Sequence, residues 1–291
     1  MKDNRFELSK KVGILGIIGN VFLFIIKIVI GYISKSHAMI ADSLNSAGDV
    51  FASFMTWLGS RISSVPNDDD HNYGHGKAEY IYSLLIGISM LIIAIKLFYD
   101  SFMSILNKNE LIFSWKLVII AIITILTKLG LFLYTKYAYK KNANLLIKSN
   151  MIDHRNDMVI TFFTLLAIIL AKYEIYFVDG VVGIGISIWI FISGIKIYRE
   201  SYNVLMDQAI DNESKKKILK ILKDNKDIKR IGSIYSVPIG YKYIVVVTIF
   251  VNGKMKTINS HKIADKMEED IIKKVDKVEN VIIHVEPYLE K

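Results

Sequence analysis

The chain has 291 residues, 52% of them hydrophobic, and its formal net charge of +9 gives a pI near 9.3. A soluble domain of this length is usually less apolar, and the mean hydropathy of +0.36 indicates a membrane protein. The basic residues lie between apolar blocks and in the tail rather than on one continuous face, so we expect no nucleic-acid partner. Because the chain has no cysteine, disulfides and thiolate metal sites are excluded.

Apolar blocks recur along the chain as far as Ile197. Each is about 20 residues long, the length that crosses the hydrocarbon core of a bilayer as a helix. The first block follows a charged segment, Met1 to Lys11, and is too long for the core of a signal peptide, so we expect it to be retained. The predicted spans are Val12–Ile33, Ala38–Ile62, Ile81–Ile105, Phe113–Tyr134, Met151–Ala171 and Ile175–Ile197.

Lysine and arginine are distributed unequally between alternate ends of these spans. The N-terminal segment and the connections after the second and fourth spans are basic, as at Lys10, Arg61 and Lys140. The opposite side has little beyond Lys35, Lys108 and Lys172. The positive-inside rule therefore predicts a cell (inner) membrane protein with both termini in the cytoplasm.

The pattern changes after Arg199, and from about Asn212 onward charges are dense and no apolar block of span length remains. A helix, two strands, a helix and a strand predict a small two-layer α+β domain of about 80 residues. Asn212 is a candidate N-cap, and Asn252-Gly253 is a turn signal. We therefore predict a transmembrane domain at residues 1–208 and a cytoplasmic domain at 209–291. Ranges are assigned to four of these five elements: the helices Glu213–Leu222 and Ser260–Val275, and the strands Tyr243–Val251 and Asn280–Glu286.

Polar side chains occur inside the second and fifth spans, where each needs a partner or a role. The second span contains Asn45 and Asp49, and the fifth contains Asp153 and Asp157. The members of each pair are four residues apart and share one face of a helix. If the two helices are neighbours, these four oxygen-bearing side chains converge, and carboxylates so close together need a cation or protons to neutralise them. Polar faces satisfied by water or by neighbouring helices are the alternative.

The donor types bear on the choice of metal. Zinc sites favour imidazole and thiolate, whereas oxygen ligands suit harder ions such as Mn²⁺ and Mg²⁺. His154 adjoins Asp153, so we expect it to point about 100° away on the helix. The residues therefore favour Mn²⁺, then Fe²⁺. Asp42, one turn before Asn45, is either a supporting partner or a residue at the external mouth.

The connection from Asn67 to Glu79 is rich in carboxylates and histidines. Asp68, His71 and His75 are candidate metal ligands, but loops also collect such residues because they are solvated. Lys77 and Glu79 are equally explained as solvated charges at the start of the third span.

These motifs together resemble the cation diffusion facilitator family over essentially the full chain. The resemblance implies six spans, a ferredoxin-like cytoplasmic domain, a homodimer and antiport of a divalent metal against protons. The motifs that carry it are Ala41-Asp42-Ser43-Leu44-Asn45 with Asp49, the Asp68–Glu79 loop (similar to His-x-x-Gly-His-Gly-Lys-x-Glu), Asp153-His154-Arg155-Asn156-Asp157 and His284-Val285-Glu286-Pro287.

The resemblance also implies roles for individual residues. Zinc-type members have a histidine in the fifth span, and the oxygen set here is similar to the manganese branch. The implied residues are Asn45, Asp49, Asp153 and Asp157 for transport, Asp68, His71 and His75 for a loop metal site, and Lys77 with Asp207 as an ion pair that holds the spans at the dimer junction.

The cytoplasmic domain departs from the zinc-type pattern, in which several histidines build a binuclear site. His261, His284 and Glu286 are present, but Gly232 and Thr248 stand at the corresponding earlier positions. The site is therefore expected to be mononuclear or absent. His261 is also explained as a solvated residue at the start of a helix.

We predict a transporter, not an enzyme, that exports Mn²⁺ against protons by alternating access and has no tightly bound cofactor. Asn45 cannot ionise, so at most three site carboxylates exchange protons. Export of Zn²⁺, Fe²⁺ or Co²⁺ is the nearest alternative. A non-transporting metal sensor and a metal-dependent intramembrane hydrolase are more remote alternatives. The sequence has no His-Glu-x-x-His motif, which counts against the hydrolase.

Overall fold

The computed structural model describes residues 3–33, 37–107, 114–171, 173 and 177–289. The chain forms two compact units. One combines Met1–Val65 with Ala78–Tyr202, and the other combines Pro66–Lys77 with Asn203–Lys291. The loop predicted to bind metal therefore belongs to the same unit as the C-terminal domain.

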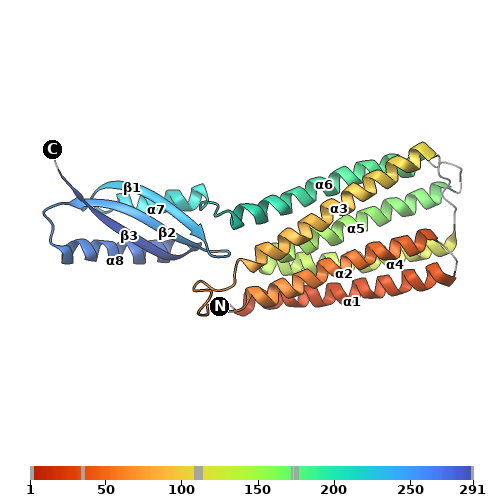
Figure 1. Ribbon diagram of the computed structural model, residues 1–291, viewed down its shortest axis with the longest axis horizontal. Helices are drawn as coiled ribbons and strands as arrows, with labels where there is room; N and C mark the ends of the chain where they lie inside the picture. Colours follow the sequence, from red (N-terminus) through yellow and green to blue (C-terminus); the bar gives the residue numbers. More distant parts are fainter. Residues whose placement is uncertain (1–2, 34–36, 108–113, 172, 174–176, 290–291) are drawn as a thin grey trace. The chain divides into compact units, whose positions relative to one another are not determined.

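The first unit is a bundle of long helices that lie side by side (Figure 1). Each of the six predicted spans corresponds to one helix, and most helices run past the predicted ends. The predicted starts of the fourth and sixth spans, Phe113 and Ile175, lie outside the described residues, and Ser114 precedes α4 as its N-cap. By length and composition, α1, α3, α4 and α6 each contain a segment able to cross a membrane, within the described residues. The helices α2 and α5 carry the polar motifs. The bounds are α1 Asp3–Ile33, α2 His37–Ser63, α3 Ala78–Asn107, α4 Trp115–Lys141, α5 Leu145–Ala171 and α6 Phe177–Leu205.

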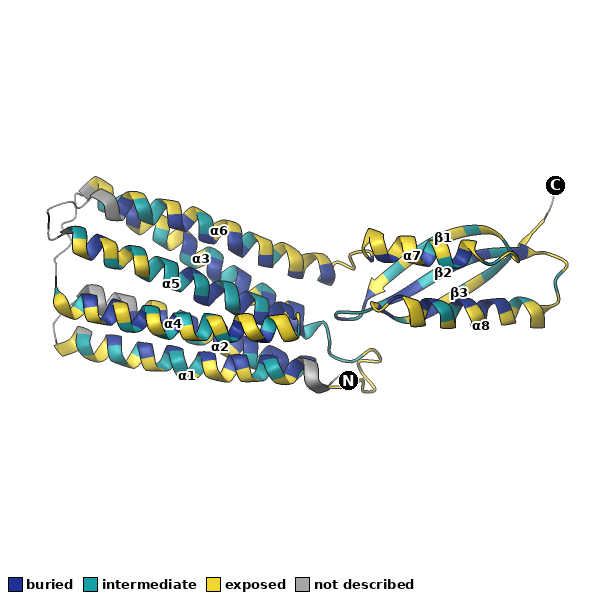
Figure 2. Cartoon of the chain, turned by 180° about the vertical axis from the view of Figure 1, so that it is seen from behind, coloured by how far each residue is buried: buried dark blue, intermediate teal, exposed yellow. Residues whose placement is uncertain are grey.

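The bundle has an apolar outer surface and polar residues inside it. Ile92 and Leu126 are 62% and 63% exposed, and Figure 2 shows exposed positions along the outer faces of the helices. Asn20 and Ser53 are fully buried. This distribution is the reverse of that in a soluble protein and suits a lipid surround.

Glycines allow α1 to approach α2 closely. A Cβ atom on Gly13 would lie 2.6 Å from the backbone nitrogen of Trp57, and one on Gly16 would lie 2.6 Å from Ser53 Oγ. Small residues at a helix contact permit this packing within membranes.

The second unit contains a three-stranded sheet with strand order β1-β2-β3. The strands β1 and β2 are antiparallel, and β2 and β3 are parallel. Val245, Val247 and Ile249 are fully buried against residues of α7 and α8. Since alternate residues of β2 are buried, both helices cover one face, which confirms the predicted two-layer domain. The bounds are α7 Asn212–Lys223, β1 Ile228–Pro238, β2 Tyr243–Asn252, α8 Thr257–Lys274 and β3 Val278–Tyr288.

The N-cap of α7 is Asp211, so the prediction of Asn212 was wrong by one residue. Asp211 Oδ1 accepts a hydrogen bond of 3.0 Å from the Ser214 amide, and Oδ2 accepts one of 2.8 Å from Lys277 Nζ. The Lys277 ammonium, followed by the Ser214 amide, holds the pKa of the Asp211 carboxyl well below its usual range. A carboxylate also suits this position because it faces the positive end of the helix dipole.

Candidate metal sites

Three charged side chains meet within the helical bundle. Lys128 Nζ lies 2.7 Å from Asp49 Oδ2 and 2.6 Å from Asp157 Oδ2. Each of these residues lies within one position of the middle of its helix, in α2, α4 and α5. Lys128 is 1% exposed. Lys128 was not among the predicted site residues: a charge at the centre of an apolar span signals a role, but not which carboxylates the charge contacts.

Hydrogen bonds between helices hold α2 in position beside this site. Asn20 Nδ2 of α1 donates to the Asp49 carbonyl at 3.1 Å and to Ser53 Oγ at 3.0 Å. Asn150 Nδ2 of α5 donates to Thr56 Oγ1 at 2.9 Å. Because these amides are buried, their bonds fix the helices against one another and thereby position the Asp49 side chain.

Asp153 and His154 lie next to Asp157. One ligand atom from each of the three residues lies within 4.8 Å of the others. Asp153 Oδ2 and His154 Nδ1 are buried and make no hydrogen bond within the described part of the chain. The expectation that His154 points away from the site was wrong, because residues 154 and 157 are three apart and share a helix face. An imidazole therefore joins the oxygen donors. We refer to Asp49, Lys128, Asp153, His154 and Asp157 as the intramembrane cluster.

A cavity of about 100 Å³ borders the intramembrane cluster. Asn45 lines it together with Asp49, Lys128 and Asp157, so the structure brings the predicted amide to the same cavity as two of the predicted carboxylates. Lys96 of α3 also lines it and is exposed. A cavity of this size accommodates several water molecules. The side chain of Asp42 lies outside the described residues.

The loop brings its three predicted ligands together. One ligand atom from each of Asp68, His71 and His75 lies within 4.8 Å of the others. Asp68 Oδ1 accepts a hydrogen bond of 2.6 Å from the His71 amide, and Asp68 Oδ2 lies 3.5 Å from His75 Nε2. Desolvation acts to raise the pKa of the Asp68 carboxyl, but the hydrogen bonds from His71 outweigh it and lower that pKa.

The histidine hydrogen bonds leave one nitrogen of each ring available. His75 Nδ1 lies 3.2 Å from the Pro66 carbonyl, which can only accept, so this nitrogen carries the proton in that contact. His71 Nδ1 lies 3.1 Å from Asp68 Oδ1. The Nε2 lone pairs then remain for a cation, in the arrangement typical of metal-ligating histidines.

The loop also contacts the turn between β1 and β2. A Cβ atom on Gly76 would lie 3.1 Å from the Ile239 carbonyl oxygen. Gly240 has a φ of +100° and a Cβ atom there would lie 3.1 Å from Gly76 Cα. This backbone approach ties the loop to the sheet of the C-terminal domain.

Lys77 and Asp207 form the predicted ion pair, at 2.9 Å. Asp207 follows α6 with a φ of 54°. The amides of Asp207 and Gln208 donate to the Val204 and Asn203 carbonyls at 3.2 and 2.9 Å, the pattern of a Schellman helix end. A left-handed aspartate costs about 1 kcal/mol, which the carboxylate contact with Lys77 helps to offset.

Glu79 is not a solvated charge. It is 1% exposed, and its Oε1 accepts a hydrogen bond of 2.7 Å from the Leu145 amide, the first residue of α5. Its carboxylate therefore caps the helix that carries Asp153 and Asp157, at the end where the dipole favours a negative charge.

The predicted cytoplasmic ligands are only partly assembled. His284 Nε2 lies 2.7 Å from Glu286 Oε1, whereas His261 lies 3.4 Å from Asp265. Among the described residues, the clusters of three candidate ligands are those of the loop and of α5, and neither contains His261. Thr248 pairs with His284 across β2 and β3, and Gly232 packs on Thr248. Gly232, Thr248 and His284 therefore form a row across the sheet. Only His284, on β3, has a side chain that is a usual metal ligand.

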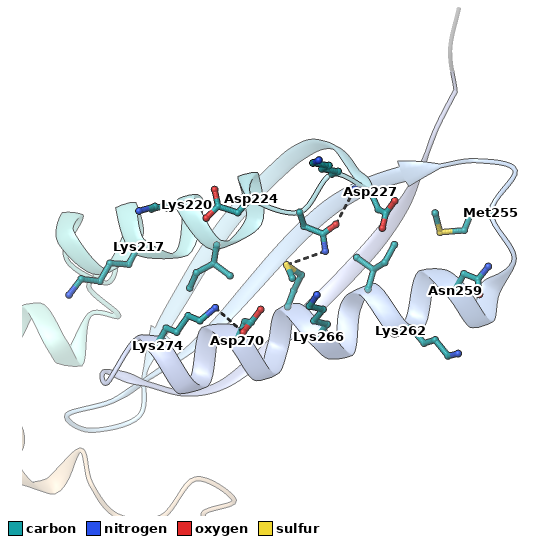
Figure 3. Close-up of a pocket in the computed structure, with 15 residues that line it drawn as sticks. Lys217, Lys220, Asp224, Asp227, Met255, Asn259, Lys262, Lys266, Asp270 and Lys274 are labelled. Carbon is teal, nitrogen blue, oxygen red and sulfur yellow. Dashed lines mark hydrogen bonds and ion pairs between the residues drawn. The ribbon is translucent and has the colours of Figure 1, made fainter.

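A hollow of about 1040 Å³ lies between α7 and α8 (Figure 3). Lys217 and Lys220 line it from α7, and Lys262 and Lys266 line it from α8. Ammonium groups outnumber carboxylates around it, so it does not have the composition of a cation site.

The bundle and its polar centre define an integral membrane protein that handles cations. The profile "Cation efflux transmembrane domain" matches residues 13–206, and "Cation efflux protein, cytoplasmic domain" matches residues 210–288. The chain therefore belongs to the cation efflux family, also called cation diffusion facilitators. It is a cation efflux transporter whose C-terminal domain is cytoplasmic, and it is not an enzyme.

Relatives are similar over most of their length. The manganese efflux system protein MneP of Bacillus subtilis is 28% identical over 100% of both chains. The manganese efflux system protein MneS of the same organism is 26% identical over 91% of both. The cation-efflux pump FieF of Shigella boydii is 24% identical over 91% of this chain and 88% of its own. The metal-bound C-terminal domain of the CzcD transporter from Thermotoga maritima is 26% identical over 28% of this chain and 100% of its own, with a TM-score of 0.26.

Proposed function

We propose that the chain exports Mn²⁺ in exchange for protons, through alternating access of one site in the middle of the membrane. The observation that carries the proposal is the convergence of two carboxylates from different helices. Asp49 Oδ2 and Asp157 Oδ2 both lie within 2.7 Å of Lys128 Nζ, beside a cavity that Asn45 also lines. Asp153 completes the set next to Asp157.

The mechanism follows from competition for the same oxygens. Facing the cytoplasm, the carboxylates of Asp49, Asp153 and Asp157 and the amide oxygen of Asn45 replace water around the metal. Facing outward, protons compete for these carboxylates and release the metal. Binding of the metal and binding of protons are mutually exclusive. The return of a protonated carrier therefore couples export to the proton gradient.

Manganese is favoured by the oxygen donors and by the similarity to two manganese efflux system proteins, MneP and MneS. His154 supports a second candidate, because imidazole is a preferred ligand of Zn²⁺. Fe²⁺ and Co²⁺ are intermediate in ligand preference.

We further propose that Asp68, His71 and His75 hold a second metal ion in the loop. The active form is proposed to be a homodimer with the N-terminus in the cytoplasm, in which the Lys77–Asp207 pair lies at the dimer junction. The match of the cytoplasmic profile to residues 210–288 supports dimerisation. His284 and Glu286 offer at most part of a cytoplasmic metal site, with His261 as the third predicted ligand.

Uptake of Mn²⁺, Fe²⁺, Zn²⁺ and Co²⁺ into sealed proteoliposomes under an imposed pH gradient tests the proposal. We expect gradient-dependent uptake with Mn²⁺ transported fastest. Uptake that favours Zn²⁺ would move the assignment to the second candidate. A protein that binds these metals but transports none of them would be a sensor, and the proposed function would be wrong.

A further inference from the structure

The Lys128 ammonium stands between two proposed metal ligands. Its distances of 2.7 Å to Asp49 and 2.6 Å to Asp157 are those of charge-assisted hydrogen bonds. A metal ion bound to the same two oxygen atoms would lie about 2.0–2.2 Å from each. The ammonium and the metal therefore compete for one position, and two cations there would repel each other.

We infer that Lys128 is a tethered cation that holds the carboxylates of the empty carrier and is displaced when the metal binds. The inference rests on the proposed function and adds a residue that determines its affinity. The competing ammonium lowers metal affinity enough to permit release. It also neutralises part of the cluster charge during the return without metal.

A second observation identifies where the displaced ammonium can bind. Thr124 lies one turn before Lys128 on α4 and lines the same cavity. Its hydroxyl is buried and makes no hydrogen bond within the residues that the structure describes. Helical side chains lean toward the N-terminal turn, so the flexible lysine stem can carry the ammonium to Thr124 Oγ1.

A purely structural ion pair is a poorer explanation of this geometry. One carboxylate is sufficient to pair with a buried ammonium, whereas Lys128 contacts carboxylates from two different helices. A fixed pair also needs no adjacent cavity and no unused hydroxyl. Both features are expected if the side chain moves between two positions.

The test measures Mn²⁺ affinity of the purified full-length protein by competition with a chelating dye at pH 8. We expect Lys128→Gln to lower the dissociation constant about tenfold or more, because the metal no longer displaces an ammonium. The same variant should transport more slowly, because tighter binding retards release. The control Lys96→Gln removes a lysine that lines the same cavity without an ion pair among the described residues. It should change the dissociation constant by less than about threefold.

Lys128→Arg provides a test in the opposite direction. Its guanidinium remains charged and bonds to two carboxylates through a rigid fork, so we expect weaker Mn²⁺ binding than in wild type. If Lys128→Gln does not fold, the affinity of Lys128→Arg decides: a raised dissociation constant supports the inference, and an unchanged one overturns it. Folded Lys128→Gln with unchanged or weaker binding would also overturn it, while wild-type transport would leave the proposed function intact. Failure of wild type to bind or transport any of the four metals would instead refute the function.

Discussion

The intramembrane cluster and the cytoplasmic sheet contain the same kinds of residue in opposite surroundings. Asp49 and Asp153 are 8% and 5% exposed and lie beside a buried lysine or histidine. The His284 side chain is 61% exposed, and Thr248 and Gly232 beside it are not metal ligands. The core of the cytoplasmic domain lies on the other face of the sheet, so its fold does not depend on that row. This difference supports the proposal that the metal is exchanged at the intramembrane cluster rather than at the cytoplasmic sheet.

The largest effect is expected from removing a carboxylate of the intramembrane cluster. Asp49→Ala, Asp153→Ala and Asp157→Ala should each reduce Mn²⁺ flux to background in proteoliposomes, because each removes a ligand. The proteins should remain folded, since the loss also relieves repulsion between like charges. Glu213→Ala, which changes a 79%-exposed carboxylate on α7, should transport normally. Near-normal flux in any of the three variants would mean that the residue it changes is not a ligand of the transport site.

A change of selectivity is the next largest effect. Asp153→His should shift the flux ratio from Mn²⁺ toward Zn²⁺ by about tenfold, because it exchanges an oxygen ligand for an imidazole. Competition flux with both metals present measures the ratio. His154→Gln, which removes the neighbouring imidazole, should shift it in the other direction. If neither variant alters the ratio, selectivity depends on Asn45 or on the loop.

The sequence predicted most of the fold because periodicity and apolar length report directly on helices and strands. It also predicted which carboxylates cluster, since residues four apart share a helix face. Helix ends were less well predicted, as at Asp211, because a cap depends on one or two hydrogen bonds. Lys128 and Glu79 were missed as functional partners for a different reason. Their contacts join Lys128 to Asp49, 79 residues away, and Glu79 to Leu145, 66 residues away, and no local pattern reports such distances.

A smaller effect is expected in the cytoplasmic domain. Asp211→Ala should destabilise α7 by about 1 kcal/mol at pH 7, because it removes the N-cap and the exposed contact with Lys277. The pKa of Asp211 is lowered in the folded state, so its stabilisation is complete above the unfolded value and is lost as the pH falls through the folded value. Hydrogen exchange at the Ser214 amide measures the difference, which should shrink below about pH 4. A difference that grew in acid would contradict this account.

The smallest effect is expected at His284, in the exposed row of the cytoplasmic sheet. His284→Ala should change Mn²⁺ flux by less than about twofold, because an exposed residue with one partner contributes little. The rate should be compared with that of His71→Ala, which removes a ligand from the assembled loop cluster and should reduce flux more. A larger loss from His284→Ala would show that the cytoplasmic row is needed for transport.

The central claim is that metal and protons exchange at the intramembrane cluster. It is tested most directly by recording Mn²⁺ uptake and internal pH together in the same proteoliposomes, for wild type and for Asp157→Ala. The account predicts that each pulse of Mn²⁺ uptake releases protons from the lumen, and that both signals vanish in the variant. Uptake of Mn²⁺ by wild type without any change in internal pH, or unchanged proton movement in Asp157→Ala, would contradict it.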